Sequence, residues 1–587
     1  MTHDDPFTAD LVTNLPLQPD ALERGTRPSL RVAVLGTCVA ESFSAPALVA
    51  GWTVDHYLAK AGRTDPLPAI CWENYDAVLV HTTIRNLLHD ATTPVDDYFF
   101  HVRDAFAYDD IVARSSDNLR HFLQRINATT AGNVPLFILA FPEPPQTFTG
   151  ILVNGRRRSF HHFVRTLNDV MAEAIEQMRG TYFVEVNDLL RSIGDAQVSD
   201  VHILHLAHLA YGASAQAKLF LRAVLRRISD ALYILQAEQP VKLIITDLDN
   251  TLWMGVLAEE DDIVPHRHHG GWPLGYAEAL LEFKRRGGLL AICSKNDHEK
   301  TLPQFRTVWT NRITFEDFCS VKINRRAKFA NIAEILEETN LLPASVLFID
   351  DDLREIAEVQ QAFPDMRFLS GAQEAWRSII LYSAQTQVAA ISAEAHSRTG
   401  LVRALAQRQT LAREVDREQF LLSLQMRVSL DIIKDAAQPQ FDRALELLNR
   451  SNQFNTTGQR WTAAQLAQAL GDGAKILALS AQDVFADNGL VALAVFKANA
   501  ITQVVMSCRV FGLGLESALL HAVIKHIHAD SAGQSNEAIT GAWFDTGRNR
   551  SSALLFAENG FVQQSGSPLQ VWELKTLPAW PHWLLGR

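Results

Sequence analysis

The stretch KLIITDLDNTL, residues 242–252, decides the fold expected for the middle of the chain. An apolar run leads directly into Asp247 and Asp249, which predicts a short buried strand with two carboxylates at its carboxyl end. Open α/β sheets place their ligands at that end of their strands. The sequence therefore predicts a site with acidic groups at the edge of a parallel sheet.

Two further apolar runs downstream each end in polar residues. LLAICS (289–294) ends in Ser294, and SVLFID (345–350) ends in Asp350 and is followed by Asp351. Because the carboxyl ends of parallel strands share one edge, we expect these residues to meet those after the first strand.

The carboxylates of Asp247, Asp350 and Asp351 would repel one another unless a divalent cation lay among them. Lys328, at the start of the helical pattern 329–338, is placed to neutralise further negative charge. Mg²⁺ is therefore the expected cofactor.

The segment 247–251 matches the DxDxT signature of the haloacid-dehalogenase (HAD) superfamily. The resemblance implies that Asp247 attacks phosphorus and that Asp249 acts as general acid and then general base. The residues expected to bind phosphate or substrate are Thr251, Ser294 and Lys328. The expected metal ligands are Asp247, Asp249, Asp350 and Asp351.

Only one helix and a loop separate Thr251 from the second strand, so no large cap domain fits between them. An open site favours a macromolecular substrate or closure by a neighbouring domain. The loop contains His266, His268 and His269, and its acidic and glycine neighbours favour a solvated flap over a metal site.

A narrower resemblance comes from the strings DLDNTLWMGVL, LLAICSKND, VKINRRAKFANI, FIDDDLRE and NRSNQFNTT (449–457), which look like the FkbH-like branch of the HAD superfamily. It implies an enzyme that takes the acyl phosphate of 1,3-bisphosphoglycerate, removes its other phosphate and loads the glyceryl unit on the phosphopantetheine thiol of an acyl carrier protein. Asp352-Leu353 departs from the Asn and Pro that the family commonly has there, which leaves the donor substrate open.

Acyl transfer needs a nucleophile besides Asp247, and a thiolate suits thioester exchange. Cys293, next to Ser294, is one candidate and Cys508 is another. The alternative for each is a small buried apolar side chain.

The C-terminal part contains an RxxGxG pattern from Arg509 to Gly514, between a predicted strand and a helix. Together with Asn549 and the segment 553–561 it resembles GNAT-type acyltransferases. The resemblance implies that Arg509, Gly512, Gly514 and Asn549 bind phosphopantetheine or coenzyme A at a helix N-terminus.

The N-terminal part resembles SGNH hydrolases. RVAVLG (31–36) leads into Cys38, where that family has its serine, and His208 stands in the closing histidine block. With cysteine in place of serine and His205 in place of the orienting aspartate, we expect a degenerate module that serves as a scaffold or docking surface. The alternative is a reactive pair formed by the Cys38 thiol and the His208 imidazole.

Alternating strand and helix patterns predict an α/β protein of three domains. They are an SGNH-like, flavodoxin-like domain (1–238), a capless HAD Rossmann-like domain (239–375) and, after a helical connector (376–424), a GNAT-like mixed α/β domain (425–587).

The composition bounds the class of protein. The 587 residues exceed what one hydrophobic core accommodates, and the net charge of −12 argues against nucleic acid or anionic membranes as partners. No apolar run long enough to span a bilayer and no signal segment is evident, so a cytoplasmic location is expected. The five cysteines form no CxxC pair, which favours neither a disulfide framework nor a zinc site.

Three hypotheses follow. The first is a carrier-protein loading enzyme that uses a phosphorylated acyl donor. The second is a small-molecule HAD phosphatase with non-catalytic flanking domains, and the third is a non-catalytic assembly factor.

Overall fold

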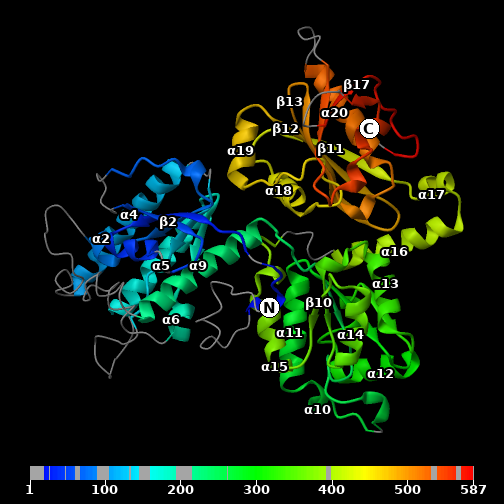
Figure 1. Cartoon of the computed structure of the whole chain (residues 1–587), viewed down its shortest axis with the longest axis horizontal. Helices are drawn as coiled ribbons and strands as arrows, with labels where there is room; N and C mark the ends of the chain where they lie inside the picture. The colour runs from blue at the N-terminus through cyan, green and yellow to red at the C-terminus, as the bar shows by residue number, and fades with distance from the viewer. Residues whose placement is uncertain are drawn as a thin grey trace. The chain divides into compact units, whose positions relative to one another are not determined.

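The computed structural model describes residues 19–25, 27–45, 48–59, 66–88, 105–130, 134–144, 159–193, 215–260, 262–391, 398–530, 538–563 and 570–585. The chain forms two compact units (Figure 1). The first lies within residues 24–232, and the second, apart from short segments, runs from Tyr233 to Arg587.

The first unit is built on a five-stranded parallel sheet with the order β2-β1-β3-β4-β5. Its strands are β1 (Arg31–Gly36), β2 (Thr53–Leu58), β3 (Ala77–His81), β4 (Leu136–Leu139) and β5 (Thr181–Val184). Its described helices are η2 (Cys38–Ser44), η3 (Trp72–Asn74), α2 (Ile84–Leu88), α4 (Ala105–Thr130), α5 (Phe160–Glu176), α6 (Asn187–Ile193) and α9 (Ala215–Leu235). This strand order is that of flavodoxin-like folds.

The second unit begins with a five-stranded parallel sheet with the order β10-β9-β6-β7-β8. Its strands are β6 (Leu243–Thr246), β7 (Leu289–Ser294), β8 (Ser320–Ile323), β9 (Val346–Ile349) and β10 (Arg367–Leu369). Because β6 lies between β9 and β7, the residues that follow these three strands are neighbours at the carboxyl edge.

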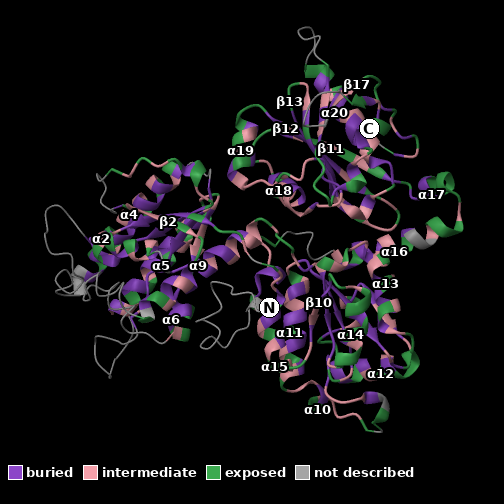
Figure 2. Ribbon diagram, in the orientation of Figure 1, coloured by how far each residue is buried: buried purple, intermediate pink, exposed green. Residues whose placement is uncertain are grey.

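Helices cover both faces of this central sheet, and Figure 2 shows its strands buried between them. One face packs on α11 (Trp272–Arg285), α12 (His298–Trp309) and α15 (Gln373–Tyr382). The other packs on α13 (Lys328–Thr339), α14 (Leu353–Ala362) and α16 (Arg398–Glu414). Because both faces of the sheet are buried, its inner strands β9, β6 and β7 consist mainly of consecutive apolar residues rather than alternating apolar and polar ones. Shorter helices are η1 (Pro19–Leu22), η4 (Leu257–Glu259), α10 (Pro265–His269), η5 (Phe315–Asp317), η6 (Pro343–Ser345) and η7 (Ala384–Thr386).

The C-terminal part of this unit holds a seven-stranded mixed sheet with the order β11-β12-β13-β14-β15-β17-β16. Its strands are β11 (Arg427–Ile433), β12 (Lys475–Gln482), β13 (Asp487–Lys497), β14 (Ala500–Met506), β15 (Thr540–Trp543), β16 (Phe561–Gln563) and β17 (Gln570–Leu574). Its helices are α17 (Arg417–Ser423), α18 (Phe441–Arg450), α19 (Ala463–Gly471), η9 (Cys508–Val510), α20 (Leu515–Asp530), η10 (Arg550–Ser552) and α21 (Leu555–Glu558).

Strands β14 and β15 are parallel and pair only near their starts, at Ala500 and Ile501. Beyond that point the chain's own segment 454–457 lies between them. Thr456 donates its backbone N–H to Val504 O (3.0 Å) and accepts from the N–H of Phe544 (2.7 Å). The opening between the two strands is therefore filled by protein backbone.

The α/β fold class expected from the sequence is confirmed, with two parallel sheets and one mixed sheet. One detail differs, because the expected connector begins inside α15. Trp376 is fully buried in the core of the central sheet, so α15 belongs to that domain. Among the helices that the structure describes, none combines the length and the hydrophobicity needed to cross a membrane.

Candidate active site

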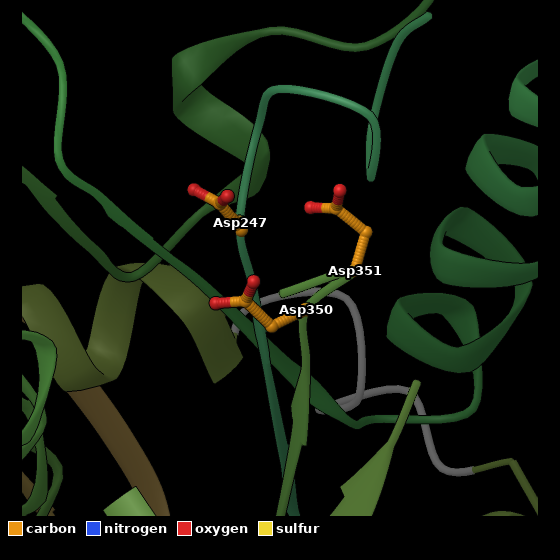
Figure 3. A group of neighbouring side chains, drawn as sticks. All are labelled: Asp247, Asp350 and Asp351. Carbon is orange, nitrogen blue, oxygen red and sulfur yellow. The ribbon is translucent and has the colours of Figure 1, made fainter. Parts of the chain in front are cut away.

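Three carboxylates gather at the carboxyl edge of the central sheet (Figure 3). Asp247 directly follows β6, and Asp350 and Asp351 directly follow β9. One carboxylate oxygen from each residue lies within 4.8 Å of the others. The structure thus brings together three of the four residues that the sequence proposed as metal ligands.

Lys328, the first residue of α13, joins two of these carboxylates. Its Nζ lies 3.0 Å from Asp247 Oδ2 and 2.5 Å from Asp350 Oδ2. Burial alone would lower the pKa of Lys328, but the charges of Asp247 and Asp350 raise it above its usual value. Lys328 is therefore a permanent cation between two acids.

Burial and the nearby charge of Asp247 raise the pKa of Asp350 to about 7, although Lys328 pulls it down. Burial and Asp247 also raise the pKa of Asp351. One lysine thus does not neutralise the group, because both acids hold protons more tightly than they would in water.

Asp351 is held in place by Thr251. The Thr251 hydroxyl donates to Asp351 Oδ1 (3.3 Å) and accepts from the Asp351 N–H (3.2 Å). Thr251 is fully buried, so in this structure its hydroxyl orients an acidic residue, whereas the sequence proposed it for binding phosphate or substrate.

Asp249 lies outside the group of three. Its Oδ1 accepts from Trp253 Nε1 (2.7 Å) and its Oδ2 accepts from Asn296 Nδ2 (2.9 Å). Burial is the main cause that raises the pKa of Asp249, with Asp247 adding to it. A carboxylate fixed by two donors and inclined to hold a proton suits a general acid better than a metal ligand.

Ser294 and Asn296 line the next strand end. Ser294 ends β7 and is buried, and its hydroxyl accepts from Asn296 Nδ2 (3.3 Å). Asn296 and Trp253 were not singled out from the sequence. Both lie within the strings quoted above for the family resemblance, but nothing in their spacing shows that they hydrogen-bond to Asp249.

A divalent cation fits this donor set. Asp247 Oδ1 is buried and has no hydrogen-bond partner among the described residues. An unpaired buried oxygen is costly, and hard cations such as Mg²⁺ take oxygen ligands of this kind. Asp247, Asp350 and Asp351 are the residues that would hold the ion.

Neither a protein-family model nor a curated protein matches the chain. Among solved structures, it is similar to the N-terminal part of a Bacteroides fragilis protein, described as containing a phosphatase domain complexed with Mg. The identity is 18%, the match covers 64% of this chain and 98% of that one, and the TM-score is 0.43.

A second similar structure is a GCN5-related glucosamine N-acetyltransferase region of a fungal multi-domain β-N-acetylglucosaminidase. The identity is 11%, the match covers 90% of this chain and 61% of that one, and the TM-score is 0.18. At such TM-scores a likeness assigns no activity, so the function has to follow from the site.

Cys293 is poorly placed for nucleophilic chemistry. Its side chain is fully buried on the α13 face of the sheet, and its thiol lies 3.7 Å from Lys328 O. Burial raises the pKa of the Cys293 thiol far above its usual value. This placement argues against its expected catalytic role and fits the small apolar side chain that was the alternative.

Asp352 and the histidine segment take structural roles. Asp352 caps α14 by accepting from the Arg354 N–H (2.8 Å), and it is not in the carboxylate group. The expected solvated flap forms the short helix α10, where buried His268 contacts Met254 O (2.9 Å) and Glu260 (3.2 Å).

The RxxGxG turn lies where expected, between β14 and α20. Gly512 and Gly514 have positive φ values of 73° and 75°, and a Cβ on Gly514 would lie 2.6 Å from Trp583. Both glycines are thus required by the backbone itself.

Asn549 is fully buried. It donates to Asn455 O and Phe544 O (both 2.8 Å) and accepts from the Thr546 N–H (3.0 Å). These bonds use its donors and acceptor within the protein, which argues against its expected role in binding coenzyme A.

In the first unit, Cys38 is exposed at the start of η2. His208, its expected partner, and His205 lie outside the described residues.

Proposed function

We propose that the central domain is a Mg²⁺-dependent phosphoryl-transfer site of the HAD type, with Asp247 as the nucleophile. The proposal is carried by one observation. Asp247, Asp350 and Asp351 converge within 4.8 Å beside Lys328, and one oxygen of Asp247 has no hydrogen-bond partner in the part of the chain that the structure describes.

The reaction divides into two displacements. In the first, a carboxylate oxygen of Asp247 bonds to phosphorus, the bond to the leaving oxygen breaks, and Asp249 supplies its proton. In the second, Asp249 takes a proton from water, whose oxygen displaces Asp247 and releases phosphate.

The surrounding residues stabilise negative charge during both steps. Lys328 contacts Asp247 and Ser294 ends the adjoining strand, which supports a role for both in holding phosphoryl oxygens. Mg²⁺, when bound by the three carboxylates, supplies the remaining positive charge.

The test is phosphate release from acetyl phosphate in the presence and absence of Mg²⁺. Asp247→Asn should lower kcat by about a thousandfold or more, since it removes the nucleophile. Asp352→Asn is the matched control, because asparagine also caps helices, and it should retain most of the activity. Equal activity of the two variants would reject the proposal.

We further propose the finer function suggested by the resemblance to the FkbH-like branch. A phosphorylated acyl donor such as 1,3-bisphosphoglycerate is dephosphorylated at Asp247, and its acyl unit passes to the phosphopantetheine thiol of an acyl carrier protein. The half-buried Cys508, at the start of the RxxGxG turn, supports this as the remaining candidate nucleophile in the C-terminal domain.

Incubation with Mg²⁺, 1,3-bisphosphoglycerate and holo carrier protein should increase the carrier mass by one glyceryl unit. Cys508→Ala should abolish the increase while phosphate release continues. Phosphate release without any change in carrier mass would favour the alternative, a small-molecule phosphatase with non-catalytic flanking domains.

A further inference from the structure

Two basic side chains lie at the amino edge of the central sheet, opposite the carboxylates. Lys242 directly precedes β6, and its backbone pairs with Leu289 and Ser345. Arg398, the first residue of α16, donates to the carbonyl of Gly287, two residues before Leu289, which begins the adjoining strand β7. Lys242 and Arg398 are therefore near neighbours.

Two further cations lie at the end of α18 in the C-terminal domain. Arg450 is the last residue of this helix. Arg460 donates to the carbonyls of Leu448 (2.7 Å) and Ser451 (3.0 Å), which belong to the same helix end. Both guanidinium groups are thus held at the carboxyl end of α18.

The η9 turn (Cys508–Val510) is close to both pairs of cations. Phe454, shortly after the end of α18, accepts from the Met506 N–H (3.1 Å), and its ring lies 5.7 Å from that of Phe511, which follows the turn. Asn340, at the end of α13, donates to Cys508 O (3.3 Å), and the loop after Asn340 reaches Ser345, which accepts from the Lys242 N–H (2.8 Å). The turn with Cys508 and Arg509 therefore lies beside the amino edge of the sheet.

The electrostatics agree with this arrangement. Burial lowers the pKa of Lys242 to about 8, and the charges of Arg398, Arg450 and Arg460 contribute to the shift. Burial lowers the pKa of Arg398 to about 9, with Arg450 and Arg509 as contributing charges. The thiol of Cys508 interacts with both Lys242 and Arg398.

Acidic groups balance only part of this charge. Glu446 pairs with both Arg443 and Arg450, and Glu238 acts on Arg460. Within the part of the chain that the structure describes, the Lys242 ammonium has no hydrogen bond or ion pair, and Arg398 donates to a carbonyl rather than to a carboxylate. Among the described residues, Lys242 and Arg398 are therefore half-buried cations without an acidic partner in contact.

We propose that Lys242, Arg398, Arg450 and Arg460 form a binding site for a phosphate-bearing small molecule next to the Cys508 thiol. Guanidinium groups bind phosphate through paired hydrogen bonds, and several cations together favour a ligand with two or more negative charges. This site is separate from the phosphoryl-transfer site and does not depend on it, because Lys242 and Asp247 lie at opposite ends of β6.

The test uses the full chain carrying Asp247→Asn, in EDTA, with inorganic pyrophosphate as the probe. Under these conditions the carboxylate edge lacks both its nucleophile and a metal. Alkylation of each cysteine by iodoacetamide is followed by peptide mass spectrometry. Pyrophosphate should slow alkylation of Cys508 at least fivefold, while the exposed Cys38 and Cys71 react at unchanged rates.

The pyrophosphate concentration that gives half of this protection is the midpoint. It should rise at least tenfold in Lys242→Gln and in Arg398→Gln. Arg285→Gln is the matched control, because Arg285 is exposed and paired with Glu282, and it should leave the midpoint unchanged. Lys242→Arg keeps the charge and should keep the protection, which guards against a variant that merely fails to fold. Absence of protection, or equal midpoints in the two charge-removing variants and the control, would overturn the proposal.

Discussion

At the scale of single residues, Lys328 carries most of the charge balance of the candidate site. It is almost fully buried between Asp247 and Asp350. Its removal leaves two buried acids without their cation, and breaking a buried pair in this way costs about 3–5 kcal/mol.

We therefore expect Lys328→Met to lower the free energy of unfolding of the metal-free protein by about 3–5 kcal/mol, measured by urea denaturation in EDTA. Added Mg²⁺ should recover part of the loss. Lys322→Met, which breaks a partly exposed pairing with Glu334 and Glu338, should cost about 1 kcal/mol or less. Similar losses for the two variants would contradict this account.

A second expectation concerns pH. The pKa of Asp350 rises from 3.8 to about 7 in the folded protein, so the folded state binds this proton more tightly. The stability that this proton contributes is fully present below pH 3.8 and is lost as the pH rises through about 7.

The metal-free protein should therefore melt at a lower temperature at pH 8 than at pH 6, and Mg²⁺ should raise the melting temperature more at pH 8. Thermal melts in EDTA and in Mg²⁺ at both pH values measure this. In Asp350→Asn the difference in melting temperature between pH 6 and pH 8 should shrink. An unchanged difference would mean that other groups cause the pH dependence.

The sequence predicted the acidic residues of the site because each directly follows an apolar strand. It could not assign Cys293, because both faces of β7 are buried and an apolar run does not show which face a residue occupies. Asn296 was missed for a related reason, since a single amide in a loop carries no periodic signal.

At the scale of elements, the segment between β14 and β15 is held by a buried amide network. Gln503 donates to Asn455 Oδ1 and to Gln459 O (both 2.9 Å), and it accepts from Trp461 Nε1 (2.7 Å). The string NRSNQFNTT, quoted above as a family resemblance, thus contributes to the structure of the C-terminal sheet.

Gln503→Leu should lower the free energy of unfolding by about 2–4 kcal/mol, because it leaves buried polar groups without partners. Gln468→Leu, on the exposed face of α19, should change it by less than about 0.5 kcal/mol. Urea denaturation checks both, and phosphate release should continue in each folded variant. A small effect of Gln503→Leu would show that water replaces its bonds.

Strand prediction succeeded where the strand is apolar along most of its length and failed where polar or charged residues interrupt it. β1 and β7 have the expected bounds. β8 (SVKI) and β10 (RFL) were missed, because each contains polar or charged residues and is partly exposed, which gives no continuous apolar run.

At the scale of the second unit, α16 packs against α13 and contacts the η9 turn of the C-terminal domain. Its Arg408 is buried, with Nε 2.6 Å from the buried Asp483 Oδ2 and Nη2 bonded to Asn488. The helical connector expected from the sequence therefore includes an ion pair with the domain that follows it.

Arg408→Met alone should destabilise the protein by about 3–5 kcal/mol, because Asp483 would remain charged and buried. The double variant Arg408→Met with Asp483→Leu should recover most of that loss, and a double-mutant cycle by thermal or urea unfolding measures the coupling. Strictly additive losses would mean that the pair is not coupled.

The α/β fold class followed from the alternation of strand and helix patterns. The start of the helical connector could not be predicted in this way. The amino-acid composition changes gradually in this region, whereas the packing against the central sheet ends at a definite residue. Trp376 lies in an Ala-, Gln- and Arg-rich region, but its side chain fills the core of the central sheet.

Strand β6 has one further consequence. At about 3.3 Å per residue, the backbone from Lys242 to Asp247 measures about 16 Å, and burial on both sides keeps it straight. A small phosphate ester is shorter than this distance and can occupy one end or the other, but not both. An inhibitor that binds at Lys242 should therefore be noncompetitive with the substrate, whereas an inhibitor that binds at Asp247 should be competitive. Initial rates at varied substrate concentration distinguish the two.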